Sequence, residues 1–168
     1  MMRTGKRLPS FCRVRPETWY FGPPIEKLAS LLLLRKVQST MTYYFAKTLE
    51  TDFESAVQRA AEALKAHGFG IITQIDVRDT FKSKIGVDFR NYRILGACNP
   101  QLAHEALQIE DKVGTMLPCN VVVQDLGGGQ VEIAAIDPVA SMMAIDNPEL
   151  KRAAEQVRDK LQRAIQDL

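Results

Sequence analysis

The fold is decided by the stretch Gly114-Thr-Met-Leu-Pro-Cys-Asn-Val-Val-Val123. Gly114 is a residue at which a preceding helix can end, and Pro118 restricts Leu117 to an extended conformation. The three valines that close the stretch have branched Cβ atoms, which suit a packed and pleated surface. The stretch therefore predicts a loop that becomes a strand at Pro118 and Cys119, and we expect this strand to be buried on both faces.

Strand patterns lie on both sides of this stretch. With the central strand included, the β-favouring segments are Thr42–Leu49, Phe69–Val77, Tyr92–Cys98, Cys119–Asp125 and Val131–Ile136. The last two are separated by Gly127-Gly128-Gly129, and glycines tolerate the positive φ that a hairpin loop requires. Because a strand and not a helix follows, these glycines predict a hairpin tip rather than a phosphate-binding loop.

Two long segments have the apolar spacing of helices. The first can be capped by Thr51 or Asp52 and can end at Gly68, and the second can be capped by Asn147. Their apolar stripes consist of Phe53, Val57, Ala60 and Leu64 in one, and Leu150, Ala154, Val157, Leu161, Ala164 and Leu168 in the other.

Two shorter helices are also predicted. One runs from Asp79 to Gly86, capped by Thr80 with Phe81 and Ile85 facing inward, and the other begins at Pro100. Together these elements predict an α+β two-layer sandwich. It has a five-stranded sheet and two long helices in the order β-α-β4-α, with short helical insertions.

Residues 1–40 differ in composition from the rest of the chain. They hold eight Lys or Arg and two Glu, whereas the remainder holds 14 basic and 18 acidic residues. Three interpretations stay open: an upstream start codon chosen in place of Met41, a basic flexible extension or presequence, and a secretory signal, for which the apolar core is short. We expect residues 41–168 to form a single α+β domain, preceded by a basic extension that is disordered or belongs to a mis-assigned start.

Composition excludes several function classes. At 168 residues and a net charge of +2, the chain has the size of one ordinary domain, and its mildly acidic body argues against nucleic acid as a partner. No apolar run approaches the roughly 20 residues of a membrane helix. Three cysteines form no disulfide framework in a chain of this size, so we expect a cytoplasmic, reducing location and no membrane.

Two cysteines are the main candidates for chemistry. Cys98 closes one predicted strand and Cys119 opens the next, so their thiols meet if these strands are antiparallel and lie at opposite ends if they are parallel. Thiols that meet could form a reversible disulfide or bind a soft metal such as Cu(I), with a thioether from Met116, Met142 or Met143. The alternative is that both are core residues, because free cysteine is usually buried as a small hydrophobe.

Asparagine follows each of these cysteines. The amides of Asn99 and Asn120 could hydrogen-bond turn backbone, or they could line one polar pocket closed by Asp137. No nucleophilic triad can be argued, because the only histidines, His67 and His104, lie on predicted helices. The sequence therefore identifies no catalytic residue and no cofactor, and the ligand of such a pocket stays unknown.

Three segments together resemble a known family: Ile94-Leu-Gly-Ala-Cys-Asn-Pro100, Leu117-Pro-Cys-Asn-Val121 and Asp137-Pro138. Over residues 41–168 the chain is similar to the bacterial and archaeal family called domain of unknown function 302. The resemblance implies a strand–helix–four-strand–helix fold, homodimers and no established activity. The residues that carry it are Cys98, Asn99, Pro100, Pro118, Cys119, Asn120 and Asp137.

These observations leave three hypotheses about function. The first is a non-enzymatic module that binds a ligand or associates with itself, as a homodimer, through a face or edge of the sheet. The second is a thiol-based redox or Cu(I)-binding protein that uses Cys98 and Cys119. The third is an enzyme with an Asn- and Asp-lined pocket, which no motif supports.

Overall fold

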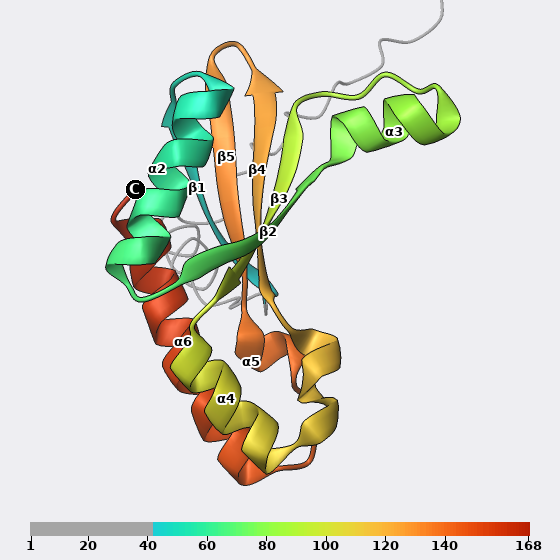
Figure 1. Cartoon of the computed structure of the whole chain (residues 1–168). Helices are drawn as coiled ribbons and strands as arrows, with labels where there is room; N and C mark the ends of the chain where they lie inside the picture. The colour runs from blue at the N-terminus through green and yellow to red at the C-terminus, as the bar shows by residue number, and fades with distance from the viewer. Residues whose placement is uncertain (1–41) are drawn as a thin grey trace, which may run out of the picture. The chain divides into compact units, whose positions relative to one another are not determined.

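A computed structural model of the chain describes residues 42–168. The predicted basic extension over residues 1–40 and the predicted start at Met41 lie outside the described residues. The strands are β1 (Tyr44–Glu50), β2 (Gly70–Asp76), β3 (Tyr92–Cys98), β4 (Cys119–Gly127) and β5 (Gln130–Ile136). They form one antiparallel sheet in the order β1-β5-β4-β3-β2, which places β1 and β2 at its edges (Figure 1).

The two long helices are α2 (Phe53–Ala66) and α6 (Pro148–Gln166), and both pack on the same face of the sheet (Figure 1). Asp52 rather than Thr51 caps α2, because its carboxylate accepts a hydrogen bond from the backbone N–H of Ser55 at 2.9 Å. Asn147 caps α6 as predicted. The predicted α+β sandwich with a strand–helix–four-strand–helix order is confirmed.

The main core lies between this pair of helices and the sheet. Leu64 of α2 and Leu161 of α6 are fully buried against Leu95, Val121 and Ile133 of the three central strands. Burial of each such side chain stabilises the fold by about 1.5–3 kcal/mol. The helical spacing of apolar residues in these two segments therefore predicts correctly which faces of α2 and α6 are buried.

The end of the sheet where β3 stops and β4 begins carries a second, smaller core. It is built from α4 (Pro100–Ile109), the 3-10 helix η1 (Asp111–Met116), α5 (Pro138–Ser141) and the first half of α6 (Figure 1). Its buried members are Ala106, Val113 and Leu150. The sequence predicts neither η1 nor α5, because helices this short lack a repeating apolar period.

Correction is needed for the prediction that β4 is buried on both faces. Val121 and Val123 are fully buried, but Val122 between them is only half-buried, because alternate side chains of a strand point to opposite faces.

Among residues 42–168 no long helix covers the face to which Val122 points. We call this the uncovered face. One apolar residue from each strand forms a continuous row across it: Ile75, Ile94, Val122, Ala134 and Ala46.

The short helix between β2 and β3 also departs from the prediction. Helix α3 (Val77–Ile85) is capped by Asp76, which accepts from the Asp79 N–H, and not by Thr80. It buries none of its residues, and Ile85, predicted to face inward, is 66 % exposed. Figure 1 shows that α3 stands away from the sheet, in agreement with this exposure.

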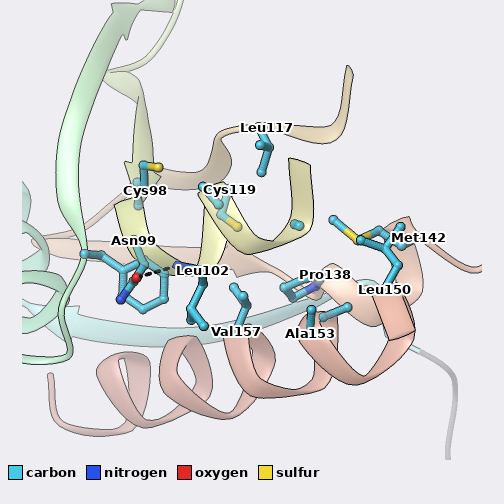
Figure 2. A pocket seen from close by; sticks show the side chains of 15 residues that line it. Cys98, Asn99, Leu102, Leu117, Cys119, Pro138, Met142, Leu150, Ala153 and Val157 are labelled. Atoms are coloured by element: carbon cyan, nitrogen blue, oxygen red, sulfur yellow. Dashed lines mark hydrogen bonds between the residues drawn. The ribbon is translucent and has the colours of Figure 1, made fainter. Parts of the chain in front are cut away.

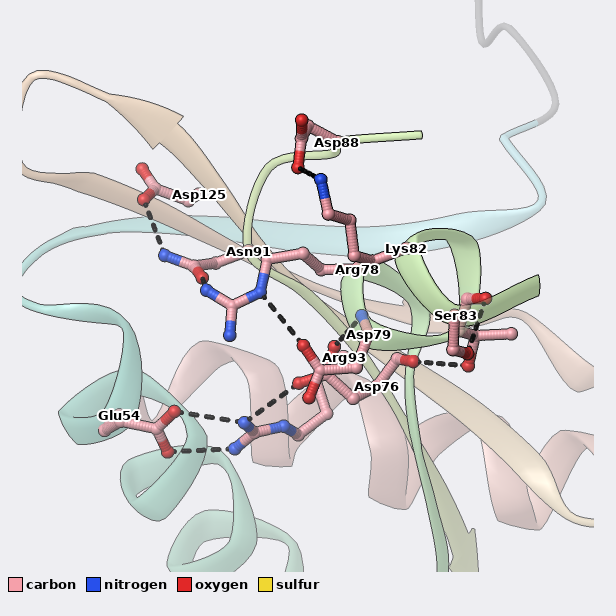
Figure 3. A network of polar contacts seen from close by, with 11 residues as sticks. Glu54, Asp76, Arg78, Asp79, Lys82, Ser83, Asp88, Asn91, Arg93 and Asp125 are labelled. Atoms are coloured by element: carbon pink, nitrogen blue, oxygen red, sulfur yellow. Dashed lines mark hydrogen bonds and ion pairs between the residues drawn. The ribbon is translucent and has the colours of Figure 1, made fainter. Parts of the chain in front are cut away.

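An arginine connects α2 to the sheet. The guanidinium of Arg93 on β3 donates two hydrogen bonds to the Glu54 carboxylate on α2, at 2.9 and 3.0 Å, and lies 3.4 Å from Asp76 at the end of β2 (Figure 3). Its guanidinium carbon also lies over the Phe53 ring, 5.2 Å from the ring centre. Hydrogen bonding to Glu54 raises the pKa of Arg93. This network joins three elements on the helix-covered face.

Within residues 42–168, none of the helices has the length and apolar character needed to cross a bilayer.

Candidate functional site

The two thiols lie at the same end of the sheet, so the antiparallel alternative is the correct one. Ala97 of β3 is opposite Cys119 of β4, which brings Cys98 next to the start of β4. Both cysteines line a cavity of about 30 Å³ between the strand ends, α4 and α6 (Figure 2). The rest of its lining is largely apolar and includes Phe69, Leu102 and Val157.

Burial disfavours the thiolate form of both cysteines. It raises the pKa of Cys119 from its ordinary value of 9.0 to about 11, with the nearby Cys98 thiol as a second cause. Burial also raises the pKa of Cys98. Reactive cysteines have the opposite environment, exposed and electropositive with a lowered pKa. This environment favours the interpretation of Cys98 and Cys119 as packing residues.

The described residues also bring no metal-ligand set together. Residues 42–168 contain no group of three or more His, Cys, Asp or Glu side chains placed to hold one ion. Of the three methionines considered from sequence, Met142 lines the cavity, at the end away from the cysteines (Figure 2). Met116 and Met143 are exposed.

Asn99 and Pro100 begin helix α4. The side-chain oxygen of Asn99 accepts from the Leu102 N–H at 3.1 Å, and its amide nitrogen donates to the Gly68 carbonyl at 3.0 Å. Pro100 occupies the first position of the helix, where no N–H is needed. Asn99 therefore serves as a helix cap and as a brace to the turn before β2, which is the backbone role that the sequence left open.

Asn120 and Asp137 do not share a pocket with Asn99. Asn120 follows Cys119 on β4, so its side chain lies on the uncovered face, away from the cavity that Asn99 lines. Asp137 accepts from the Val139 N–H at 2.9 Å and caps α5. The polar pocket proposed from the two asparagines and Asp137 is thus not formed.

Pro118 joins two of the segments that carry the family resemblance. A Cβ placed on Gly96 would lie 2.7 Å from the Pro118 ring and 2.2 Å from the Thr73 hydroxyl, so only glycine fits at this position of β3. Leu117 is extended, with ψ 150°, as the proline predicts, and the Leu117–Pro118 peptide bond is cis. Gly96 of the first segment and Pro118 of the second therefore pack closely against each other, where β3 lies beside the start of β4.

A larger hollow, of about 320 Å³, lies on the uncovered face over β1, β5 and β4. Among its described lining residues, Asn120 is the one that the sequence identifies as a candidate site residue. The sequence does not indicate the other lining residues, because three consecutive valines predict that β4 is buried on both faces. The signal that was available is the pair of polar residues at alternate positions, Asn120 and Gln124, which lie with Val122 on one face of the strand. The hollow is lined by Tyr43, Tyr44, Tyr92, Asn120, Val122, Gln124, Glu132, Ala134 and Ile136.

Element order and sheet topology define a two-layer α+β domain with one face of the sheet uncovered by long helices of the described residues. The family model of "Domain of unknown function DUF302" matches residues 45–168, and the chain belongs to this family. A solved relative is the crystal structure of an uncharacterised conserved DUF302 protein from Bacillus stearothermophilus. It is 29% identical with a TM-score of 0.69, covering 74% of this chain and 97% of the other. No curated protein matches the chain.

Proposed function

We propose that the protein is a non-enzymatic module that associates with a second copy of itself through the free edge of β1. The observation that carries the proposal is the hydrogen-bond pattern of this strand. The Tyr43 carbonyl accepts from the Asp137 N–H at 2.7 Å, and the Thr51 N–H donates to the Gly129 carbonyl at 3.1 Å. The backbone N–H and C=O groups of the odd-numbered residues of β1 therefore point toward β5.

Even-numbered residues of β1 consequently direct their backbone groups away from the sheet. Since β1 pairs only with β5 among the described residues, these N–H and C=O groups lack a strand partner there. Such an edge is a template for another strand. The residues that offer it are Tyr44, Ala46, Thr48 and Glu50.

The opposite edge is less suited to pairing. The register of β2 shifts between Ile71 and Thr73, and a bulge of this kind twists an edge away from regular pairing. In contrast, β1 pairs over its seven residues without a register shift. Lys47 is the one cation on β1, and its ammonium donates to the Gln166 carbonyl at the end of α6, at 2.7 Å. This contact keeps the charge on the helix-covered side.

Pairing of two β1 strands about a twofold axis would be isologous and antiparallel. It would join two five-stranded sheets into one continuous sheet and would satisfy the outward backbone groups of both copies.

Proline at position 48 tests this proposal. The Thr48 N–H points away from β5, so Thr48→Pro removes an edge donor while it leaves the β1–β5 hydrogen bonds intact. Light scattering of the full chain during size-exclusion chromatography should give a dimer mass for the unmodified protein and a monomer mass for Thr48→Pro. The matched control is Thr48→Val, which keeps both the N–H and the branched Cβ and should stay dimeric. A monomeric unmodified protein, or a dimeric Thr48→Pro variant, would contradict the proposal.

The thiol alternative has weaker support. The shared cavity of Cys98 and Cys119 favours it, whereas the raised pKa of both thiols opposes it. Cu(I) titration of the unmodified chain beside Cys98→Ser and Cys119→Ser would revive it if tight stoichiometric binding were lost in both variants.

A further inference from the structure

The hollow on the uncovered face has the dimensions and composition of a small-molecule site. Its volume of about 320 Å³ lies within the range of about 300–1,000 Å³ typical of ligand pockets. The apolar floor is formed by Val122 and Ala134, which are opposite each other on β4 and β5. Aromatic rings reach it from both sides, Tyr44 from β1 and Tyr92 from β3.

The hollow has one charged side chain among its described lining residues, and that is Glu132 on β5. Gln124 Nε2 donates to Glu132 Oε1 at 2.6 Å, and Arg90 donates to Gln124 Oε1 at 2.6 Å. These two hydrogen bonds fix the orientation of the Gln124 amide. They leave Glu132 Oε2 without a hydrogen bond within residues 42–168. A carboxylate oxygen is thus available beside an apolar floor.

We propose that this hollow binds a flat organic cation. The ring of such a ligand would lie on Val122 and Ala134, and its ammonium group would donate to Glu132 Oε2. Charge-assisted hydrogen bonds are roughly twice as strong as neutral ones, and the faces of the phenol rings attract a cation. The proposal goes beyond self-association, since a pairing through the β1 edges does not use this face of the sheet.

Charge decides the class of ligand. An anion would meet the Glu132 carboxylate. The nearby Arg90 guanidinium is engaged with Gln124 and packs against the rings of Phe89 and Tyr92, at 4.6 and 5.4 Å from their centres. We therefore expect the order of affinity to be cation, then neutral aromatic, then anion.

Three probes with the same ring system test this order on the unmodified full chain: tryptamine as the cation, 3-ethylindole as the neutral form and indole-3-acetate as the anion. Backbone NMR shifts measured during titration should saturate for tryptamine, centred on β4 and β5. Its affinity should exceed that of the neutral probe by about tenfold, as expected for one charged hydrogen bond. Equal affinities, stronger binding of the anion or no saturable shift with tryptamine would overturn the proposal.

A pair of carboxylate variants locates the site. Glu132→Gln keeps an acceptor for Gln124 and should lose about tenfold in tryptamine affinity. Glu50→Gln removes a carboxylate that lies on β1, on the same face of the sheet as Glu132 but outside the hollow. This variant should bind tryptamine as tightly as the unmodified chain does. Equal effects of the two substitutions would overturn the assignment to Glu132, and the comparison of probes stands even if Glu132→Gln fails to fold.

Discussion

At the scale of single residues, most of the positions that the sequence singled out serve the architecture. Asn99 and Asp137 cap helices, Pro100 starts one, and Pro118 packs against a glycine. The sequence identifies these positions because caps and breaks need particular residue types. It does not reveal which cavity each side chain lines, since that depends on how the strands pair.

The buried thiol of Cys119 makes stability depend on alkaline pH. Its pKa is about 11 in the folded protein and near 9.0 when the chain unfolds. The unfolded state therefore loses its proton first, and the free energy of unfolding falls as the pH rises from 9 to 11. The loss from this group amounts to about 2 kcal/mol.

Urea unfolding of the full chain at pH 8 and at pH 11 measures this effect, with Cys119→Ala as the reference. Between pH 8 and pH 11, the free energy of unfolding of the unmodified protein should fall by about 2 kcal/mol more than that of Cys119→Ala. An identical pH dependence in both would show that the Cys119 thiol titrates normally.

At the scale of elements, periodic segments are predicted well and isolated ones are not. Helices α2 and α6 repeat their apolar spacing over several turns, so both their existence and their buried faces are evident from sequence. Helix α3 has only three apolar residues at helical spacing, and nothing in the sequence indicates that it lies outside the sheet layer. Element α2 is also held by a partner distant in sequence, Arg93, which no local pattern indicates.

The Arg93–Glu54 pair should contribute measurably to stability. Its hydrogen bonds are bidentate and the Arg93 side chain is only 19% exposed, although Glu54 is 71% exposed. A double-mutant cycle with Arg93→Met and Glu54→Gln should give a coupling energy of about 1 kcal/mol in urea unfolding. The exposed pair Lys112–Asp111, treated in the same way, should couple by about 0.3 kcal/mol or less. Equal coupling in the two pairs would mean that bidentate geometry adds nothing here.

At the scale of the whole described unit, the sequence predicts the class of fold and the number of strands. It does not predict the two surfaces to which we assign binding, the β1 edge and the hollow. Strand order follows from pairings between segments far apart in the chain, and only these reveal that β1 is an edge. The same pairings turn the alternate residues of β4 into one covered and one uncovered face. The hollow and the free edge are both consequences of this topology.

Self-association through β1 is tested most directly by amide hydrogen exchange at single residues as the protein concentration is raised. In the monomer, the outward N–H groups of Tyr44, Ala46, Thr48 and Glu50 should exchange quickly, whereas those of Phe45, Lys47 and Leu49 are protected by β5. In the dimer, we expect the four outward amides to become protected as well, which removes the alternation along the strand. Outward amides that stay fast while the mass doubles would show that the copies meet elsewhere and would contradict the proposed pairing.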